Sequence, residues 1–399
     1  MKEGWRMVKL GEVCETSAGG TPSKLHKEYY ENGNIPWMLS GEVCHKYIYD
    51  VEHYITQEGL NNSSAKLFPE NTVVVAMYGA TAGQVGILKL ETSTNQAVCG
   101  ILPNDNILPE YLYYYFLYYK DLLVAQAVGN AQPNISQQKI KSVEFPFLSI
   151  EEQHRIVSIL DASFEKIDAL KKNAEENLKN AKALFQQVLA QELKPKEGWV
   201  EKKLSEVCDI RPSRSLHFKS LNENDDVSFL PMEDLGIYDR KTEASKTKKI
   251  KEVSGSYTYF EDGDILLAKV TPCFENGKMG IVYNLVNKIG FGSSEYIVFR
   301  PLNVIIKEFV YYHLANPIFR NQGKHLMLGA CGLKRLSKDY VNNYIVSFPT
   351  DIEEQHRIAR TLDTLSEKCS RLEQVAQQTI RECDALKQSI LRQAFSGEL

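Results

Sequence analysis

The heptapeptide IEEQHRI occurs twice in this chain of 399 residues, beginning at Ile150 and again at Ile352. The repetition extends over the whole sequence, because GWRMVKLGEVC at 4–14 is matched by GWVEKKLSEVC at 198–208. The matches keep their order, while their offset grows from 194 to 202 residues. The chain is therefore a tandem duplication with small insertions in its second copy, and its fold must consist of two similar halves.

Each copy begins with a mixed region, residues 1–149 and residues 195–350. Short β-rich runs such as NTVVVAMYG and GDILLAKV alternate with turn signals such as EDGD. An aromatic helical run follows, PEYLYYYFL at 109–117 and KEFVYYHLA at 307–315. We predict an α+β globular domain for each region, with the periodic aromatic residues in its core.

The rest of each copy, residues 150–194 and 351–399, is predicted to be one long helix. No Pro or Gly occurs between Glu151 and Leu193, and apolar residues recur at steps of three and four. A helix of roughly 60 Å cannot bury its apolar stripe alone, so each helix is expected to pair with the helix of the other copy. Within the heptapeptide, the isoleucines are expected to start the stripe and the Gln and Arg to face outward.

The predicted fold class follows from these two parts. It is α+β, with two pseudo-two-fold-related globular domains separated by a coiled coil of two helices. A two-fold relation between the copies requires the two helices to be antiparallel. Two unlike domains at the ends of a stiff spacer suit the reading of two half-sites on duplex DNA.

Composition restricts the possible functions. The net charge is −4, and residues 1–194 hold 18 basic and 23 acidic residues, against 29 and 28 in residues 195–399. Net charge does not exclude a local basic surface, and partner subunits can supply phosphate contacts. The sequence has no run of 18 apolar residues and no apolar signal core at its start, so we expect a cytoplasmic protein with no membrane partner. The eight cysteines form no CxxC pair, so neither a zinc site nor a disulfide framework is expected.

Catalytic motifs are not found in the sequence. There is no GxxxxGK[ST] phosphate loop and no HExxH zinc motif. ANPIF at 315–319 lacks the second proline of the Asn-Pro-Pro-aromatic loop of amino-methyltransferases. We therefore predict no catalytic and no metal-binding residue on this chain.

Loops of the globular domains carry the candidate DNA contacts. Gly-rich turns let a backbone approach a phosphate, and Thr, Ser, Lys and Gln side chains can reach phosphates or base edges. The candidates in the first copy are Thr21, Ser23, Lys24, Ser40, Tyr78, Gly79, Thr81 and Gln84. The candidates in the second copy are Arg211, Arg214, Lys269, Thr271, Asn276, Lys278, Lys334 and Arg335. Loops at 129–136 and 329–337 belong to the same set.

The chain resembles the specificity subunit of a type I restriction-modification system. The resemblance rests on the Glu-Val opening of each half, on the Phe-Pro…Ile-x-Glu-Gln-x-x-Ile junction into each long helix, and on the duplicated layout. It covers essentially the full length. The stretch TPCFENGK at 271–278 is similar to one frequent in the recognition domains of this family, which singles out Lys269, Thr271, Asn276 and Lys278 in the second copy.

The resemblance implies a function and a set of partners. Target recognition domains at 1–149 and 195–350 would each read one half of a split sequence in double-stranded DNA. Spacer helices at 150–194 and 351–399 would dock two copies of a DNA adenine methyltransferase subunit, and motor-nuclease restriction subunits would complete the complex. The resemblance implies a non-catalytic chain without a cofactor, with S-adenosylmethionine on the methyltransferase partner and ATP and Mg on the motor-nuclease partner.

Two other classes of function stay open from the sequence alone. The first is a coiled-coil scaffold or adaptor with two protein-binding end modules, which the acidic first half favours. The second is a free-standing enzyme acting on nucleic acid, against which the missing motifs count.

Overall fold

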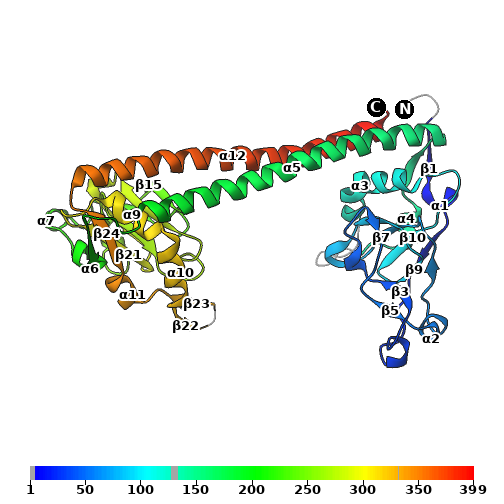
Figure 1. Cartoon of the computed structure of the whole chain (residues 1–399), viewed down its shortest axis with the longest axis horizontal. Helices are drawn as coiled ribbons and strands as arrows, with labels where there is room; N and C mark the ends of the chain where they lie inside the picture. The colour runs from blue at the N-terminus through cyan, green and yellow to red at the C-terminus, as the bar shows by residue number, and fades with distance from the viewer. Residues whose placement is uncertain (1–4, 127–133, 331) are drawn as a thin grey trace. The chain divides into compact units, whose positions relative to one another are not determined.

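The computed structural model describes residues 5–126, 134–330 and 332–399, and it contains two compact units (Figure 1). Unit 1 comprises Met1–Ala174 and Gln378–Leu399, and unit 2 comprises Glu175–Gln377. Each unit therefore contains one globular domain and parts of both long helices.

The globular part of unit 1 contains two sheets, a strand pair and short helices. Its strands are β1 (Arg6–Lys9), β2 (Thr16–Ala18), β3 (Ile35–Met38), β4 (Tyr47–Ile48), β5 (Tyr54–Ile55), β6 (Leu67–Phe68), β7 (Val73–Ala76), β8 (Val85–Leu88), β9 (Thr92–Thr94), β10 (Val98–Ile101) and β11 (Glu144–Phe147). Its helices are α1 (Leu10–Val13), α2 (Gln57–Asn61), α3 (Pro109–Ala125) and α4 (Gln137–Lys141), with 3-10 turns η1 (Lys27–Tyr29), η2 (Ser40–Glu42) and η3 (Gly79–Thr81). The strand orders are β2-β10-β7-β8-β4, β5-β3-β9-β6 and β1-β11.

The globular part of unit 2 repeats this arrangement. Its strands are β12 (Trp199–Lys203), β13 (Cys208–Ile210), β14 (Asp226–Leu230), β15 (Asp239–Glu243), β16 (Lys246–Lys249), β17 (Thr258–Glu261), β18 (Ile265–Ala268), β19 (Met279–Tyr283), β20 (Ile289–Gly292), β21 (Tyr296–Pro301), β22 (Leu328–Ala330), β23 (Leu333–Arg335) and β24 (Ile345–Pro349). Its helices are α6 (Leu204–Val207), α7 (Leu216–Lys219), α8 (Ile250–Val253), α9 (Lys307–Ala315), α10 (Pro317–His325) and α11 (Lys338–Asn343), with the 3-10 turn η4 (Val286–Lys288). The strand orders are β13-β21-β18-β19-β15, β16-β14-β20-β17, β12-β24 and β22-β23.

The two five-stranded sheets share their strand order and so do the two four-stranded sheets, while the pair β22–β23 has no counterpart among the described strands of unit 1. In unit 1, β3 pairs with β9 and β4 with β8 in parallel; in unit 2, β14 pairs with β20 and β15 with β19 in parallel. The central strands β7 and β18 are buried along their whole length, as expected for apolar runs that are covered on both faces. The duplication and the α+β class predicted from the sequence are thus confirmed.

The aromatic helix of each copy lies in the core, as predicted. Tyr111, Tyr114 and Tyr115 of α3 are buried, and so are Tyr311 and Tyr312 of α9. The same helix therefore supports the five-stranded sheet in both units.

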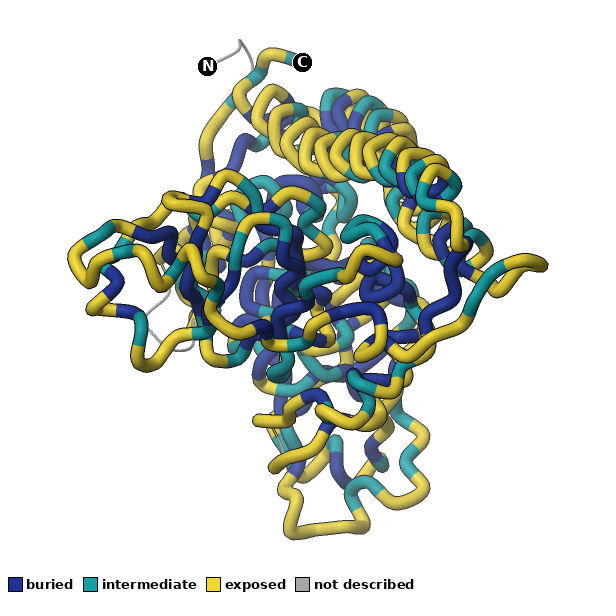
Figure 2. Tube along the Cα trace, turned by 90° about the vertical axis from the view of Figure 1, so that its left-hand side faces the viewer, coloured by how far each residue is buried: buried dark blue, intermediate teal, exposed yellow. Residues whose placement is uncertain are grey.

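Two long helices begin at the repeated heptapeptide, α5 at Ile150–Glu192 and α12 at Ile352–Ser396. The backbone N–H groups of Glu152 and Glu353 in the first turns donate to the side chains of Ser149 and Asp351. The glutamates of the first turn place negative charge at the positive end of the helix dipole. Figure 2 shows exposed residues along much of both helices.

The helices are antiparallel within each unit. In unit 1, Lys171 of α5 pairs with Asp384 of α12 at 2.7 Å, and Asp168 pairs with Lys387, so that numbering rises on one helix as it falls on the other. In unit 2, the end of α5 and the beginning of α12 share one core, which includes Leu193 and Ile358. The predicted pairing is therefore confirmed within each unit.

Small residues of the predicted apolar stripe are buried in the middle part of the long helices. They include Ala174, Ala181, Cys369, Ala376 and Cys383. Small side chains let two helices approach closely, so the larger residues flank the seam. Three large residues of the predicted stripe are instead exposed, namely Leu170 (51%), Leu372 (55%) and Leu386 (48%).

The glutamine of the heptapeptide is buried, contrary to the outward orientation that we expected. Gln153 is fully buried, and its Oε1 accepts from the backbone N–H of Leu108 at 2.9 Å. Its Nε2 donates to the carbonyls of Asn106 (2.8 Å) and Leu148 (3.0 Å). The loop before α3 covers this face of α5, and helical periodicity alone does not reveal such a cover.

The second copy repeats this arrangement. Gln355 is also fully buried, accepts from the N–H of Ile306 at 2.9 Å, and donates to the carbonyls of Val304 and Pro349. The glutamine therefore joins each globular domain to the start of its helix. By contrast, Arg155 and Arg357 are exposed, as predicted.

Candidate nucleic-acid interface

The loop that follows β18 in unit 2 gathers several of the predicted residues. The hydroxyl of Thr271 donates to the carbonyl of Lys334 and accepts from the backbone N–H of Lys334, both at 3.2 Å. The backbone N–H of Thr271 donates to the same carbonyl at 3.0 Å. Val270 forms a bridge with Arg335. The hairpin β22–β23 is thereby fixed to the 269–278 loop, with Lys334 and Arg335 exposed.

Basic side chains converge at the base of this loop. The amine of Lys269 donates to the carbonyl of Ser294 at 2.7 Å, and Glu295 accepts from Arg335 at 2.8 and 3.0 Å. The pKa of Lys269 is lowered, mainly because its amine is partly buried. The charge of Glu295 raises this pKa, and the charges of Arg211 and Arg335 lower it further. Lys269 and Arg335 thus share the carboxylate of Glu295, and Arg211 adds a third positive charge near Lys269, which leaves an excess of positive charge.

A hollow of about 260 Å³ opens beside this cluster, lined by Arg211, Lys269, Ser294 and Tyr296 among others. Arg211 is exposed and has a left-handed backbone (φ 64°), which is uncommon for a residue with a side chain. Cationic side chains around such a hollow suit a phosphate group.

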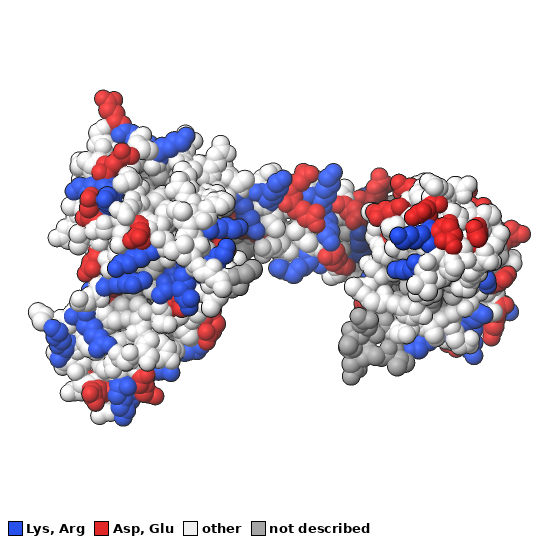
Figure 3. All heavy atoms as spheres, turned by 90° about the horizontal axis from the view of Figure 1, so that it is seen from below, with Lys and Arg blue, Asp and Glu red and all other residues white. Residues whose placement is uncertain are grey.

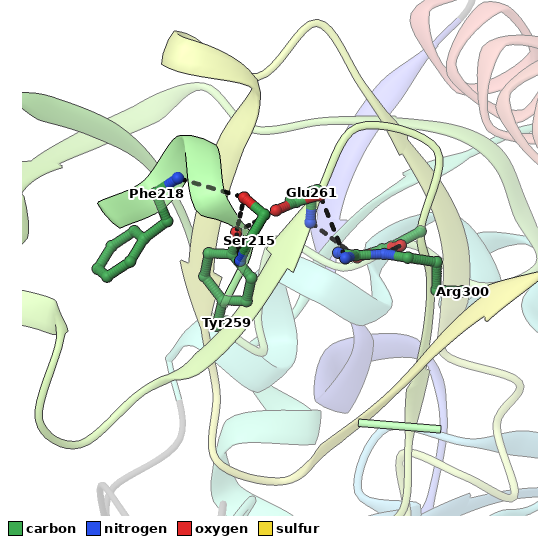
Figure 4. A network of polar contacts seen from close by, with 6 residues as sticks. Ser215, Phe218, Tyr259, Glu261 and Arg300 are labelled. Atoms are coloured by element: carbon green, nitrogen blue, oxygen red, sulfur yellow. Dashed lines mark hydrogen bonds and ion pairs between the residues drawn. The ribbon is translucent and has the colours of Figure 1, made fainter. Parts of the chain in front are cut away.

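The other end of the Arg211 loop is held by a polar network (Figure 4). The Oγ of Ser215 accepts from the N–H of Phe218 at the start of α7, and its backbone N–H donates to the hydroxyl of Tyr259. Tyr259 donates to Glu261, which pairs with Arg300 at 3.2 Å. The loop is therefore positioned by the neighbouring sheets.

Three predicted residues of unit 2 lie apart from this cluster. Arg214 donates to the carbonyl of Ser254 and lies over the ring of Phe218. Lys278 donates to the carbonyls of Met232 (2.6 Å) and Glu233 (3.3 Å), so it joins two loops of the domain. Asn276 is exposed at the tip of its loop.

A buried arginine, which the sequence analysis missed, positions the same loop. Arg320 of α10 is 7% exposed and donates to the carbonyl of Phe274 at 2.9 Å. Its guanidinium lies over the rings of Tyr238 and Phe274. Burial lowers its pKa to about 10. Nothing in the local sequence distinguishes Arg320 from an exposed helical arginine.

The first loop of unit 1 holds Thr21, Ser23 and Lys24. Thr21 donates to the side chain of Gln96, while Ser23 and Lys24 are exposed. The preceding Gly19 is required by internal packing, because an added Cβ would lie 2.1 Å from Oγ1 of Thr94.

The second predicted loop of unit 1 surrounds η3. Tyr78 is 37% exposed, and Gly79 has a left-handed backbone (φ 72°) with open space where a side chain would lie. Thr81 accompanies them on the same turn. Gln84 points inward, and its Oε1 is buried without a hydrogen-bond partner among the described residues.

Two further predicted DNA-contact regions of unit 1 remain, Ser40 and the loop at 129–136. Ser40 begins the turn η2 and is half-buried. The predicted loop at 129–136 falls largely outside the described residues, which resume at Asn134.

Backbone hydrogen bonds align the loops of the two units. In unit 1 the N–H of Ile135 donates to the carbonyl of Met77, and in unit 2 the N–H of Leu336 donates to the carbonyl of Lys269. Met77 and Lys269 are therefore at equivalent positions. The β-bridge between Tyr78 and Asn134 in unit 1 matches the bridge between Val270 and Arg335 in unit 2, so Asn134 is the counterpart of Arg335.

The offset of 194 residues relates Arg211 to Ser17, and the two residues lie beside matching positions of the neighbouring strand, Val298 and Gly100. Unit 2 thus has three cations where unit 1 has Ser, Met and Asn. Figure 3 shows Lys and Arg side chains gathered on a face of unit 2.

Each long helix also holds its domain through an aspartate. In unit 1, Asp161 of α5 accepts from Lys46 and from the hydroxyl of Tyr114. In unit 2, Asp363 of α12 accepts from Arg240 at 2.9 and 3.2 Å and from Tyr312. These residues recur at the offsets of the repeat, so aligning the two copies would have revealed them.

No group of three or more His, Cys, Asp or Glu in residues 5–126, 134–330 and 332–399 is placed to hold a metal ion. In those same ranges, no helix has the length and apolar character needed to cross a membrane.

Comparison with known proteins identifies the class defined by this fold. The model of the type I restriction modification DNA specificity domain matches residues 2–180 and again residues 196–382. The chain belongs to this family, and both of its halves carry the domain.

Several characterised relatives are specificity subunits of type I restriction enzymes. The MjaIX subunit of Methanocaldococcus jannaschii is 26% identical over 349 residues, which cover 77% of this chain and 78% of that subunit. The EcoEI subunit of Escherichia coli is 34% identical over 195 residues, 49% of this chain. Those residues span 32% of the EcoEI subunit's length. The resemblance found in the sequence is confirmed.

Solved structures share the fold. A chain from a study of complex assembly and conformational transition in the type I R-M system has a TM-score of 0.77 at 21% identity and covers 100% of this chain and 99% of that chain. The HsdS subunit of Thermoanaerobacter tengcongensis has a TM-score of 0.58 at 20% identity, with 100% of this chain and 98% of that chain covered.

Proposed function

We propose that this chain is the DNA-binding specificity subunit of a type I restriction-modification complex, in which each unit reads one half of an asymmetric bipartite target. One observation carries this proposal: equivalent backbone positions hold Arg211, Lys269 and Arg335 in unit 2 and Ser17, Met77 and Asn134 in unit 1. A shared scaffold with unlike loops is what two different half-sites require.

DNA phosphates would bind at the basic cluster of unit 2, and base edges would be read from the loops around it. Arg and Lys side chains are the usual partners of phosphates and of guanine in the major groove. The residues of unit 1 at the matching positions are uncharged, so unit 1 would contribute less to the electrostatic part of binding.

The paired helices would dock two copies of a DNA adenine methyltransferase subunit. Leu170 and Leu386 are half-exposed on the helices of unit 1, and Leu184 and Leu372 are half-exposed on those of unit 2. The offset of 202 residues relates Leu170 to Leu372 and Leu184 to Leu386. An apolar surface repeated in this way suits two copies of one partner.

In this proposal the chain has no catalytic activity and no cofactor of its own. The methyltransferase subunits would bring S-adenosylmethionine, and motor-nuclease subunits would bring ATP and Mg. The assembly would act on double-stranded DNA in the cytoplasm.

A coiled-coil scaffold with two protein-binding end modules is the second candidate, because the half-exposed leucines suit any helical partner. The basic cluster at Arg211, Lys269 and Arg335 favours DNA over this alternative. Sequence-specific methylation that depends on the chain would separate the two candidates.

The test is an exchange of the loops and sheets of unit 2. Residues 210–335 are replaced by those of a relative, and the chain is expressed with its methyltransferase in a host that lacks other adenine methylation. Single-molecule sequencing of modified adenines should show that one half of the methylated motif changes while the other half is kept. A change in both halves, or no motif with either chain, would contradict the proposal.

A further inference from the structure

Unit 2 contains a cavity of about 380 Å³ between its globular domain and its helices. Small side chains of α9 and α12 line it, namely Ala315, Ser366 and Cys369, and the rings of Tyr311, Tyr312 and Phe185 form the walls. A cavity of this size lies within the range of small-molecule sites.

The first copy shows what fills the equivalent space. The offset of 198 residues relates Leu117 to Ala315, and the offset of 202 relates Phe164 to Ser366 and Ile167 to Cys369. In unit 1, the ring of Phe164 packs edge-on against Tyr114, with centroids 5.3 Å apart at 77°. Three large residues have therefore become small in the second copy.

The tyrosine that receives the ring is kept in both copies. Tyr312 stands where unit 1 has Tyr114, and the hydroxyl of each tyrosine donates to the aspartate of its helix. Phe185 takes the place of Lys387 and lines the cavity without closing it. One ring, that of Phe185, therefore reaches the cavity from α5, and the space of about 380 Å³ remains beside it. Its aromatic walls suit a further aromatic ring.

The charges around the cavity favour an uncharged occupant. Arg240 is paired with Asp363 at 2.9 and 3.2 Å and with Glu308 at 3.6 Å. Lys182 and Glu373, of opposite sign, also line the cavity. Because Arg240 is already paired and Lys182 and Glu373 balance each other in charge, the lining has no net charge that would select an ion over a neutral molecule.

We propose that this cavity binds a small uncharged aromatic molecule with one hydrogen-bonding group, of the size of indole or a substituted phenol. Its ring would take the position that Phe164 has in unit 1, edge-on to Tyr312. Its polar group would meet the hydroxyl of Ser366 or Ser370 or the side chain of Gln186, which also line the cavity. This binding site is separate from the loops proposed to read DNA.

The test uses the full chain and indole as the probe, with binding measured by titration calorimetry. The wild-type chain should bind indole saturably at one site. Ser366→Phe supplies the ring found in unit 1 and should lower the affinity at least tenfold. Gln374→Phe adds a ring at an exposed position of the same helix and should leave the affinity unchanged.

A second filled variant makes the result independent of one substitution. Ala315→Leu with Cys369→Ile restores the other two residues of unit 1, and it decides the matter should Ser366→Phe fail to fold by circular dichroism. Absence of saturable indole binding by the wild-type chain, or equal affinity in the folded filled variants, would overturn the proposal. Neither result bears on the DNA-reading function, because methylation of the target is measured separately.

Discussion

Single side chains decide how the two units differ, and the basic cluster of unit 2 is the clearest case. Lys269 replaces a methionine on an otherwise matched backbone, and it lies beside Arg211, Arg335 and one carboxylate. The half-buried carboxylate of Glu295 pairs with both Arg335 (2.8 Å) and Lys269 (3.7 Å). Two cations therefore share one carboxylate, and the remaining positive charge can hold a second anion.

Lys269→Met, which installs the residue of unit 1, is therefore expected to weaken DNA binding. The loss of one phosphate contact should reduce the slope of log affinity against log salt by about 0.9. The measurement is a salt titration of DNA binding by the complex with its methyltransferase. Lys202→Met in β12 removes a charge outside the loops and serves as the control. An unchanged slope in the Lys269 variant would remove this residue from the interface.

His313 gives unit 2 a dependence on pH that its counterpart Tyr115 does not give unit 1. His313 is 4% exposed and its Nε2 lies 2.9 Å from the carbonyl of Ser347. Burial lowers its pKa to about 4. In the unfolded chain a histidine takes up its proton near pH 6.5, so the unfolded state gains protons first as pH falls.

The stability of unit 2 should consequently decrease between pH 6.5 and pH 4, by roughly 3 kcal/mol in total from this residue. His313→Gln keeps a donor for the carbonyl of Ser347 but does not titrate, so its unfolding midpoint should fall less steeply over this range. Urea unfolding at several pH values measures the difference. His356→Gln, at a helix position, is the control, and parallel pH profiles for wild type and His313→Gln would refute the assignment.

At the scale of elements, the long helices and the junctions into them are the most regular part of the molecule. Their apolar period, their acidic first turns and the absence of Pro and Gly made α5 and α12 predictable, because all these signals are local. The strand orders were not predictable, because pairing such as β14 with β20 joins segments far apart in sequence. The orientation of Gln153 was predicted wrongly, since the loop that covers it is also distant in sequence.

The candidate site was predictable only as a set of loops. Lys269, Thr271, Lys334 and Arg335 do come together in unit 2. Lys278 instead joins two loops through backbone carbonyls. Its sequence context is the same as that of a DNA-binding lysine, and only the fold brings the 231–236 loop within its reach.

The buried glutamines should be essential to the junctions. Gln355→Leu leaves one backbone N–H and two carbonyls without their partner in a buried setting, which is expected to cost about 2–4 kcal/mol of stability. Gln153→Leu should do the same in unit 1. Urea unfolding of the full chain measures both, and His154→Leu, at an exposed position of the same turn, should be close to neutral. Equal stability of the glutamine and histidine variants would show that the three hydrogen bonds contribute little.

The half-exposed leucines of the long helices should contribute to the binding of methyltransferase subunits and little to the stability of the chain. Leu170→Glu with Leu386→Glu places charge on the helix surface of unit 1, where these side chains are 51% and 48% exposed. The variant should stay folded and bind one methyltransferase subunit in place of two. Light scattering of the purified complex gives the ratio. The corresponding pair in unit 2 is Leu184→Glu with Leu372→Glu, and a two-to-one complex with all four substitutions would refute the docking surface.

At the scale of the whole molecule, the duplication has preserved some parts and changed others. The junction glutamines, the helix aspartates and the strand orders recur in both copies. The loops differ in charge, and the space beside Ser366 is open in unit 2, whereas Phe164 packs against Tyr114 at the equivalent position of unit 1. The residues that attach each domain to the helices recur in both copies. The residues that would face a ligand, in the loops and in the cavity, differ between the copies. Such a division suits a chain whose two halves perform the same task on different sequences.

The last prediction concerns the spacing between the half-sites. Because α5 and α12 are continuous helices that lead out of one unit and into the other, four residues inserted into each would lengthen both by about 6 Å. Four residues are also close to one full turn, so the apolar seam stays nearly in phase. The unread gap in the methylated motif should grow by one or two base pairs, while both half-sites keep their bases. Sequencing of modified adenines in cells that carry the insertion measures the gap. A gap of unchanged length would mean that the helices do not set the distance between the recognition domains, even if each domain still reads its own half-site.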